Sequence, residues 1–175
     1  PRNKMRLPVF ALSLYTALLG QTQVHEEGAI VIGGGSASSI MPTRNSGTIV
    51  HPIAGSAIEI GKPFPFAYKT SNWCHTGYTH ISAWLMEYEP GEEDLDGSGK
   101  LQSARYHFGD WTQSNFAQLP DLPENSPAEL TIPEHVMAGL RGGEMYFSVV
   151  EHATDCPPRN MPTQFGIASS HVYVM

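Results

Sequence analysis

The fold is decided by residues 64–86, which read FPFAYKTSNWCHTGYTHISAWLM. Phe64, Phe66 and Tyr68 alternate with smaller residues, and side chains two positions apart lie on the same face of a β-strand. Three aromatic rings therefore line one face of a first strand. The end of the segment alternates in the same way and places three apolar side chains on one face: Ile81, Ala83 and Leu85. We expect these two strands to form the centre of the core.

Short strand-like segments, separated by turn residues, occur on both sides of this region. They are residues 29–32, 48–51, 57–60, 101–108, 129–132, 145–151 and 166–174. The chain has 17 glycines and 14 prolines, which interrupt helices and mark turns. No amphipathic helix is indicated. This spacing predicts an all-β fold, an immunoglobulin-like antiparallel β-sandwich of about seven strands with one disulfide.

The N-terminal region predicts a signal peptide. An apolar stretch, residues 7–19, follows three basic residues, Arg2, Lys4 and Arg6. It has the length of a signal-peptide core and is short for a membrane span. We expect the signal peptide within residues 1–20, including a short extension before Met5, and cleavage between positions 20 and 24. A flexible segment rich in Gly and Ser (21–47) and one β-sandwich domain (48–175) are expected to follow.

The charge balance restricts the classes of partner. Removing the leader leaves seven basic residues against seventeen acidic ones, a formal charge of about −10. Nucleic acids and anionic membrane surfaces are bound through clustered Lys and Arg, so neither is an expected partner. We expect a secreted, extracellular protein.

Cys74 and Cys156 are the only cysteines of the chain. In an oxidising compartment an isolated pair is usually joined, so the sequence predicts a Cys74–Cys156 disulfide. This link closes a loop of about 83 residues, which the chain-entropy model values at about 4.5 kcal/mol of stability. It is expected to tie the turn before one central strand to the end of another.

A spaced pattern of Pro, Gly and core residues opens the organised region: Pro52, Gly55, Ile58, Gly61, Phe64, Phe66 and Tyr68. LTIP at residues 130–133 and YFSVVE at residues 146–151, before Cys156, continue it. Over roughly Thr48 to Val174 the chain resembles a group of small secreted β-sandwich proteins of mushroom-forming fungi that have no assigned activity. The opening is also similar to fungal necrosis-inducing secreted effectors. The resemblance implies a secreted fungal protein, but it does not imply a ligand.

Two patterns suggest metal ligands. Asp94, Asp96 and Ser98 occupy the first, third and fifth positions of a calcium-loop-like segment, but Arg105 stands where such a loop needs a bidentate Glu. A solvated hairpin loop is therefore the favoured interpretation. Cleavage after residue 24 would make His25 the N-terminal residue, which can bind copper through its amine and ring if a second His reaches the same ion. No spacing selects that second ligand among the candidates His75, His80, His107, His152 and His171. Neither pattern predicts a cofactor.

Catalytic signatures are absent from the sequence. The glycine-rich run at residues 33–38 imitates a dinucleotide-binding turn but has no βαβ context, so a linker is favoured. No nucleophile elbow occurs. Four acids could serve as the paired carboxylates of a glycoside hydrolase, but no spacing pairs them: Asp110, Glu144, Glu151 and Asp155.

Exposed aromatic side chains would favour sugar binding, and the candidates for stacking on a ligand are Trp73, Tyr78 and Trp111. We therefore expect a non-catalytic extracellular binding protein that acts at the fungal wall or as an effector, with a polysaccharide or an extracellular protein as its partner. A carbohydrate-binding or copper-dependent carbohydrate-active protein is the alternative.

Overall fold

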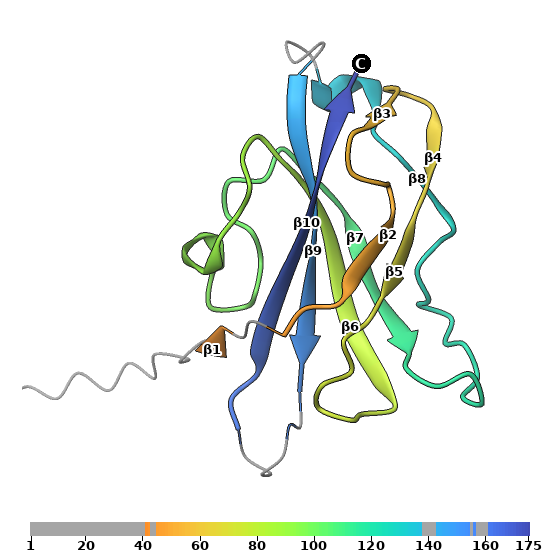
Figure 1. Ribbon diagram of the computed structural model, residues 1–175, viewed down its shortest axis with the longest axis vertical. Helices are drawn as coiled ribbons and strands as arrows, with labels where there is room; N and C mark the ends of the chain where they lie inside the picture. The colour runs from red at the N-terminus through yellow and green to blue at the C-terminus, as the bar shows by residue number, and fades with distance from the viewer. Residues whose placement is uncertain (1–40, 43–44, 138–142, 155, 157–160) are drawn as a thin grey trace, which may run out of the picture. The chain divides into compact units, whose positions relative to one another are not determined.

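Figure 1 shows the computed structural model of the chain, whose structure is described for residues 41–42, 45–137, 143–154, 156 and 161–175. The predicted signal peptide and its cleavage region, the strand expected at 29–32, the glycine-rich run at 33–38 and His25 all lie outside the described residues. No helix within the described ranges has the length and apolar character to cross a membrane.

One six-stranded sheet forms the centre of the described domain (Figure 1). Four long antiparallel strands make up most of it, in the spatial order β10 (Gln164–Val174), β9 (Gly143–Ala153), β6 (Tyr78–Met86) and β7 (Tyr106–Ser114). The short strands β1 (Met41–Pro42) and β3 (Ser56–Ile58) pair in parallel with the two ends of β10. Long strands pair with β6 and β9 on both sides, whereas β10 has only the short strands β1 and β3 on its outer side, so we call β6 and β9 the interior strands.

Two short ribbons cover one face of this sheet. One pairs β2 (Thr48–His51) with β5 (Ala67–Lys69), and the other pairs β4 (Pro63–Pro65) with β8 (Glu129–Thr131). Phe64, Phe66 and Tyr68 are buried in one apolar cluster with side chains of β6, β9 and β10. Phe64 and Phe66 both meet the ring of Phe147, with ring centroids 6.0 Å and 5.6 Å away. The expected aromatic face therefore joins the ribbons to the sheet.

A long loop, residues 87–105, covers the central part of the other face. It contains the short 3₁₀ helix η1 (Glu92–Asp94), and a second one, η2 (Glu134–Met137), follows β8. Leu95 and Leu101 face each other in an isolated bridge and pack with Trp84 and Phe165 of the sheet. Both faces of β6 are consequently buried from Ile81 to Met86.

The all-β class and the disulfide are confirmed, and several details differ from the expectation. The number of strands exceeds about seven, since the described residues form one six-stranded and two two-stranded sheets. Residues 64–68 do not form one strand. The chain pairs with β8 up to Pro65 and with β2 from Ala67 onward, and the backbone N–H of Phe66 between them donates to the carbonyl of Ala128. The strand expected at 101–108 begins only at Tyr106, because the residues before it belong to the covering loop.

Gly99 is one of the positions at which this loop lies directly on the sheet. Its φ is +80°, and a Cβ there would collide with the ring of Phe165. We expect Gly99→Ala to lower the free energy of unfolding by about 1–3 kcal/mol, because the side chain adds both backbone strain and overpacking. The matched control is Gly97→Ala in the same loop, where a Cβ meets nothing within 4 Å. Urea unfolding of both variants tests this, and equal stabilities would show that the loop is not tightly packed on Phe165.

Candidate functional site

A buried carboxylate lies at the end of β9 beneath the ribbons. Glu151 is 2% exposed, and its oxygens accept hydrogen bonds from four donor groups, one of which reaches both oxygens. The donors are Gly47 N–H (3.0 Å), the Tyr68 hydroxyl (3.0 Å), Ser71 N–H (3.0 Å) and the Ser71 hydroxyl (2.6 Å). All of these donors are neutral. A buried charge is tolerated only when such bonds replace its water, so Glu151 fixes the chain segments that supply them.

The groups around Glu151 fit this role. Burial, followed by the charge of Glu151 and the hydrogen bond to it, raises the pKa of Tyr68, so the phenol keeps the proton that it donates. Gly47 has room for no side chain, since a Cβ there would lie 2.7 Å from the ring of Tyr68. The backbone before β2 can therefore approach the carboxylate only with glycine at this position.

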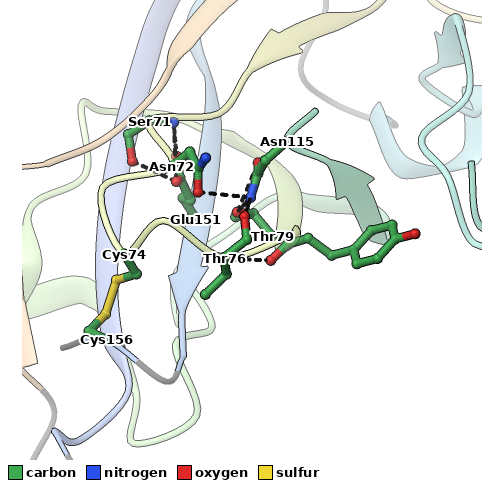
Figure 2. Close-up of a disulfide and its surroundings, with 9 residues drawn as sticks. Ser71, Asn72, Cys74, Thr76, Thr79, Asn115, Glu151 and Cys156 are labelled. Atoms are coloured by element: carbon green, nitrogen blue, oxygen red, sulfur yellow. Dashed lines mark hydrogen bonds between the residues drawn. A yellow bond between two sulfur atoms is a disulfide. The ribbon is translucent and has the colours of Figure 1, made fainter. Parts of the chain in front are cut away.

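Asn115, just after β7, forms a second centre of hydrogen bonds (Figure 2). Its Oδ1 accepts from the Thr70 hydroxyl at 2.7 Å. Its Nδ2 donates to Asn72 Oδ1 at 3.1 Å and to the carbonyl of Thr76 at 2.9 Å. The hydroxyl of Thr79, 2.8 Å from Nδ2, completes the set. One amide thus holds four residues from the end of β5 to the start of β6.

The disulfide is a third constraint on the residues that Glu151 and Asn115 hold between β5 and β6. We call residues 70–77 the disulfide loop, because Cys74 within it is bonded to Cys156 beyond β9. As expected, the link connects the turn before β6 with the end of β9. Asn72 and His75 have positive φ values of 45° and 53°, a backbone conformation that costs free energy and persists where the surroundings impose it. Glu151, Asn115 and the disulfide supply that constraint.

The disulfide loop borders a polar trough between β5 and β7. Two hollows, of about 340 and 430 Å³, share Tyr68, Gln113 and Ser114 in their walls, and together they form the trough. The smaller hollow extends along residues 121–128, and the larger one extends along the disulfide loop. Besides the three shared residues, the trough is lined by Phe66, Ala67, Lys69, Thr70, Ser71, Asn72, Asn115, Asp121, Asn125, Ser126, Pro127 and Ala128. Amide and hydroxyl side chains make up most of this lining.

The three aromatic candidates do not share one surface. Trp73 packs against the disulfide, and its buried Nε1 has no hydrogen-bond partner. Tyr78, at the start of β6, donates its hydroxyl to the carbonyl of Pro120 at 3.2 Å. Trp111 is half-buried against the ring of Phe66, with centroids 5.6 Å apart. None of the three lines the trough.

The calcium-loop candidates use their oxygens within the loop. Asp94 accepts from the Tyr88 hydroxyl and from Gly91 N–H, and Asp96 accepts from the N–H and hydroxyl of Ser98 and from the N–H of Lys100. These bonds lower the pKa of Asp96, the one from Lys100 N–H contributing most. Across the described ranges, no group of three or more His, Cys, Asp and Glu side chains is arranged to enclose a metal ion.

The acids considered for hydrolysis are placed apart. Glu151 and Glu144 lie seven residues apart on β9, which separates them by about 23 Å along the strand. Glu151 faces the ribbons, whereas Asp110 of β7 lines a different hollow. Asp155 lies outside the described residues. Comparisons of the chain with protein-family models, with curated proteins and with solved structures find no match.

Sequence reasoning considered Glu151 only as a possible hydrolase carboxylate and did not consider Asn115. One signal for Glu151 was available, because it continues the buried alternation of Phe147 and Val149 on β9 and so occupies a core position. Asn115 carries no comparable signal. Its partners lie 36 to 45 residues earlier in the chain, and only the fold brings them together.

We expect Asn115→Ala to lower the free energy of unfolding by about 2–4 kcal/mol, because it leaves several buried or half-buried polar groups without partners. Asn125→Ala is the matched control, since Asn125 is an exposed amide on the far wall of the trough. Thermal unfolding of both variants measures the difference. An Asn115 variant as stable as the control would mean that the amide does not hold the disulfide loop.

Proposed function

We propose that this protein is a non-catalytic extracellular binding protein, and that the trough binds a neutral, hydroxyl-rich ligand of the carbohydrate class. The observation that carries the proposal is the lining of the trough, which consists mainly of amides and hydroxyls on paired strands and on a loop held from three sides. Side chains held in this way lose little conformational entropy when a ligand binds.

The free polar groups of the trough suit sugar hydroxyls. Asn115 and Ser71 are occupied by the internal network, but the Nδ2 of Asn72, the Oε1 of Gln113 and the Nδ2 of Asn125 have no partner among the described residues. Amides supply both donors and acceptors, and a sugar hydroxyl requires both. Phe66 and Tyr68 are buried, so binding would depend on hydrogen bonds more than on ring stacking.

The charges along the trough argue against hydrolysis. Most glycoside hydrolases need two carboxyl groups on either side of the scissile bond. Among the described residues that line the trough, Asp121 is the only acid and Lys69 the only base. Glu151 is buried, and its oxygens are occupied by hydrogen bonds from four donor groups. This arrangement favours binding over catalysis.

Two further predictions support the same proposal. The predicted signal peptide and the disulfide are both compatible with secretion, and the resemblance to small secreted fungal proteins suggests a fungal wall polysaccharide or a surface of another organism as the partner. An immunoglobulin-like sandwich is the arrangement that we propose for the sheet and its ribbons.

The proposal is tested by binding of the secreted protein to insoluble chitin, β-glucan and mannan, followed by calorimetry with soluble fragments of the polysaccharide that retains it. We expect one of these polymers to bind, and Gln113→Ala combined with Asn125→Ala to weaken binding at least tenfold. Gln102→Ala is the matched control, because Gln102 is an exposed amide in the loop on the other face. Retention of none of the polymers, or equal binding by the double variant and the control, would contradict the proposal.

A further inference from the structure

Two histidines face each other across the interior strands. His80 of β6 and His152 of β9 are directly paired in the antiparallel register. Side chains at such positions have Cβ atoms about 4.5–5.5 Å apart, which lets two imidazole rings reach one ion. Both belong to the alternation that includes Trp84 and Val150, so they lie on the face of the sheet away from the ribbons, beyond the edge of the covering loop.

The ring of His80 is oriented by a neighbour. Its Nδ1 lies 2.7 Å from the hydroxyl of Thr112, which is buried on β7 at the position paired with His80. Histidines that bind metals are typically held through one ring nitrogen in this way, which leaves the other nitrogen free for the ion. The Nε2 of His80 has no partner among the described residues.

The second histidine has an unsatisfied nitrogen. The Nε2 of His152 is buried and has no hydrogen-bond partner, although its ring packs edge-on against Phe165. A buried polar atom without a partner is rare and points to a bound water or ion. Burial, and to a smaller extent the charge of His80, lowers the pKa of His152 to about 4 against the opposite effect of Asp110.

A hollow of about 240 Å³ opens at this pair. We call it the histidine hollow. Its lining consists of His80, His152, Thr112, two acidic residues, Asp110 and Glu124, and the apolar residues Ile81 and Trp111. It shares no lining residue with the trough. Asp110 also lies 3.3 Å from the Nε2 of His107, without the alignment of a hydrogen bond. The two carboxylates give the hollow a negative potential that favours a cation.

We propose that His80 and His152 bind one divalent transition-metal ion of the zinc or copper class in the histidine hollow. Imidazole nitrogens favour these ions over magnesium and calcium, which prefer oxygen. Because the described residues contain no three-ligand cluster, the protein supplies two nitrogens and the ion keeps positions open to water or to a partner molecule. The site is independent of the trough and of its proposed ligand.

The test is calorimetric titration of the full secreted chain, carrying no histidine tag, with ZnCl₂. We expect one Zn²⁺ per chain and at least a tenfold loss of affinity in His80→Ala, whose exposed side chain can be removed without affecting the core. His135→Ala, which removes an exposed histidine of η2, is the matched control and should bind as the wild type does. Absence of Zn²⁺ binding at 1 mM, or equal affinity in His80→Ala and His135→Ala, would overturn the proposal.

Two further variants separate ligation from folding. His152→Gln keeps a polar side chain and should weaken Zn²⁺ binding as much as His80→Ala. Thr112→Val keeps the shape of the side chain and removes the hydroxyl that orients His80, so a smaller loss of affinity is expected. With Cu²⁺ as the probe, electron paramagnetic resonance should detect two imidazole nitrogens in the Thr112 variant and one in His80→Ala. The same nitrogen count in both would overturn the assignment of His80 as a ligand.

Discussion

The placement of the β2–β5 ribbon on the sheet depends on one buried charge. Glu151 extends from an interior strand, and its carboxylate accepts hydrogen bonds from the residue before β2, from Tyr68 in β5 and from the start of the disulfide loop. These segments are separated from Glu151 by 80 to 104 residues of sequence. A carboxylate without its donors would be costly in this position, because it would have lost water without replacement. The apolar core packs the ribbons on the sheet, and the hydrogen bonds of Glu151 fix the position of the β2–β5 ribbon on it.

Polar contacts of Glu151 and Asn115 also hold one wall of the trough, the disulfide loop. The disulfide loop contains two non-glycine residues with positive φ, and its apolar contacts are few besides those of Trp73 and Cys74. Its conformation is therefore held by hydrogen bonds to Glu151 at one end and to Asn115 along its length, and by the covalent link to Cys156. Hydrogen bonds of this kind specify one geometry, whereas apolar packing tolerates several. A binding wall built in this way suits a ligand that is recognised through hydrogen bonds.

Much of the fold could be predicted from periodicity, because its decisive residues are local. The alternation of Phe64, Phe66 and Tyr68 placed three rings on one face, and all three are in the core. The cysteine pair followed from composition alone. The beginning of β7 was missed because Leu101 is apolar and buried without belonging to a strand, and pattern reading does not distinguish a docked loop from a strand.

The sites were harder to predict, since they depend on contacts between distant residues. Nothing in the spacing of His80 and His152 along the chain indicates that they are paired, and the register of β6 on β9 is needed to show it. The trough likewise joins residues 66–72 to residues 113–128. The aromatic candidates were chosen for their residue type, whereas the lining of the trough is set by position in the fold.

The most direct measurement of the role of Glu151 is hydrogen exchange by NMR in Glu151→Gln and in Glu144→Gln, an exposed carboxylate on the same strand that serves as the control. The substitution keeps the shape of the side chain but removes the charge and directs an NH₂ group at donors. We expect the amides of Gly47 and Ser71 to lose at least tenfold in protection in Glu151→Gln, while the amide of Phe147 in β9 loses much less. Protection at Gly47 and Ser71 equal to that in the Glu144 variant would contradict the conclusion that this carboxylate holds the β2–β5 ribbon and the disulfide loop to the sheet.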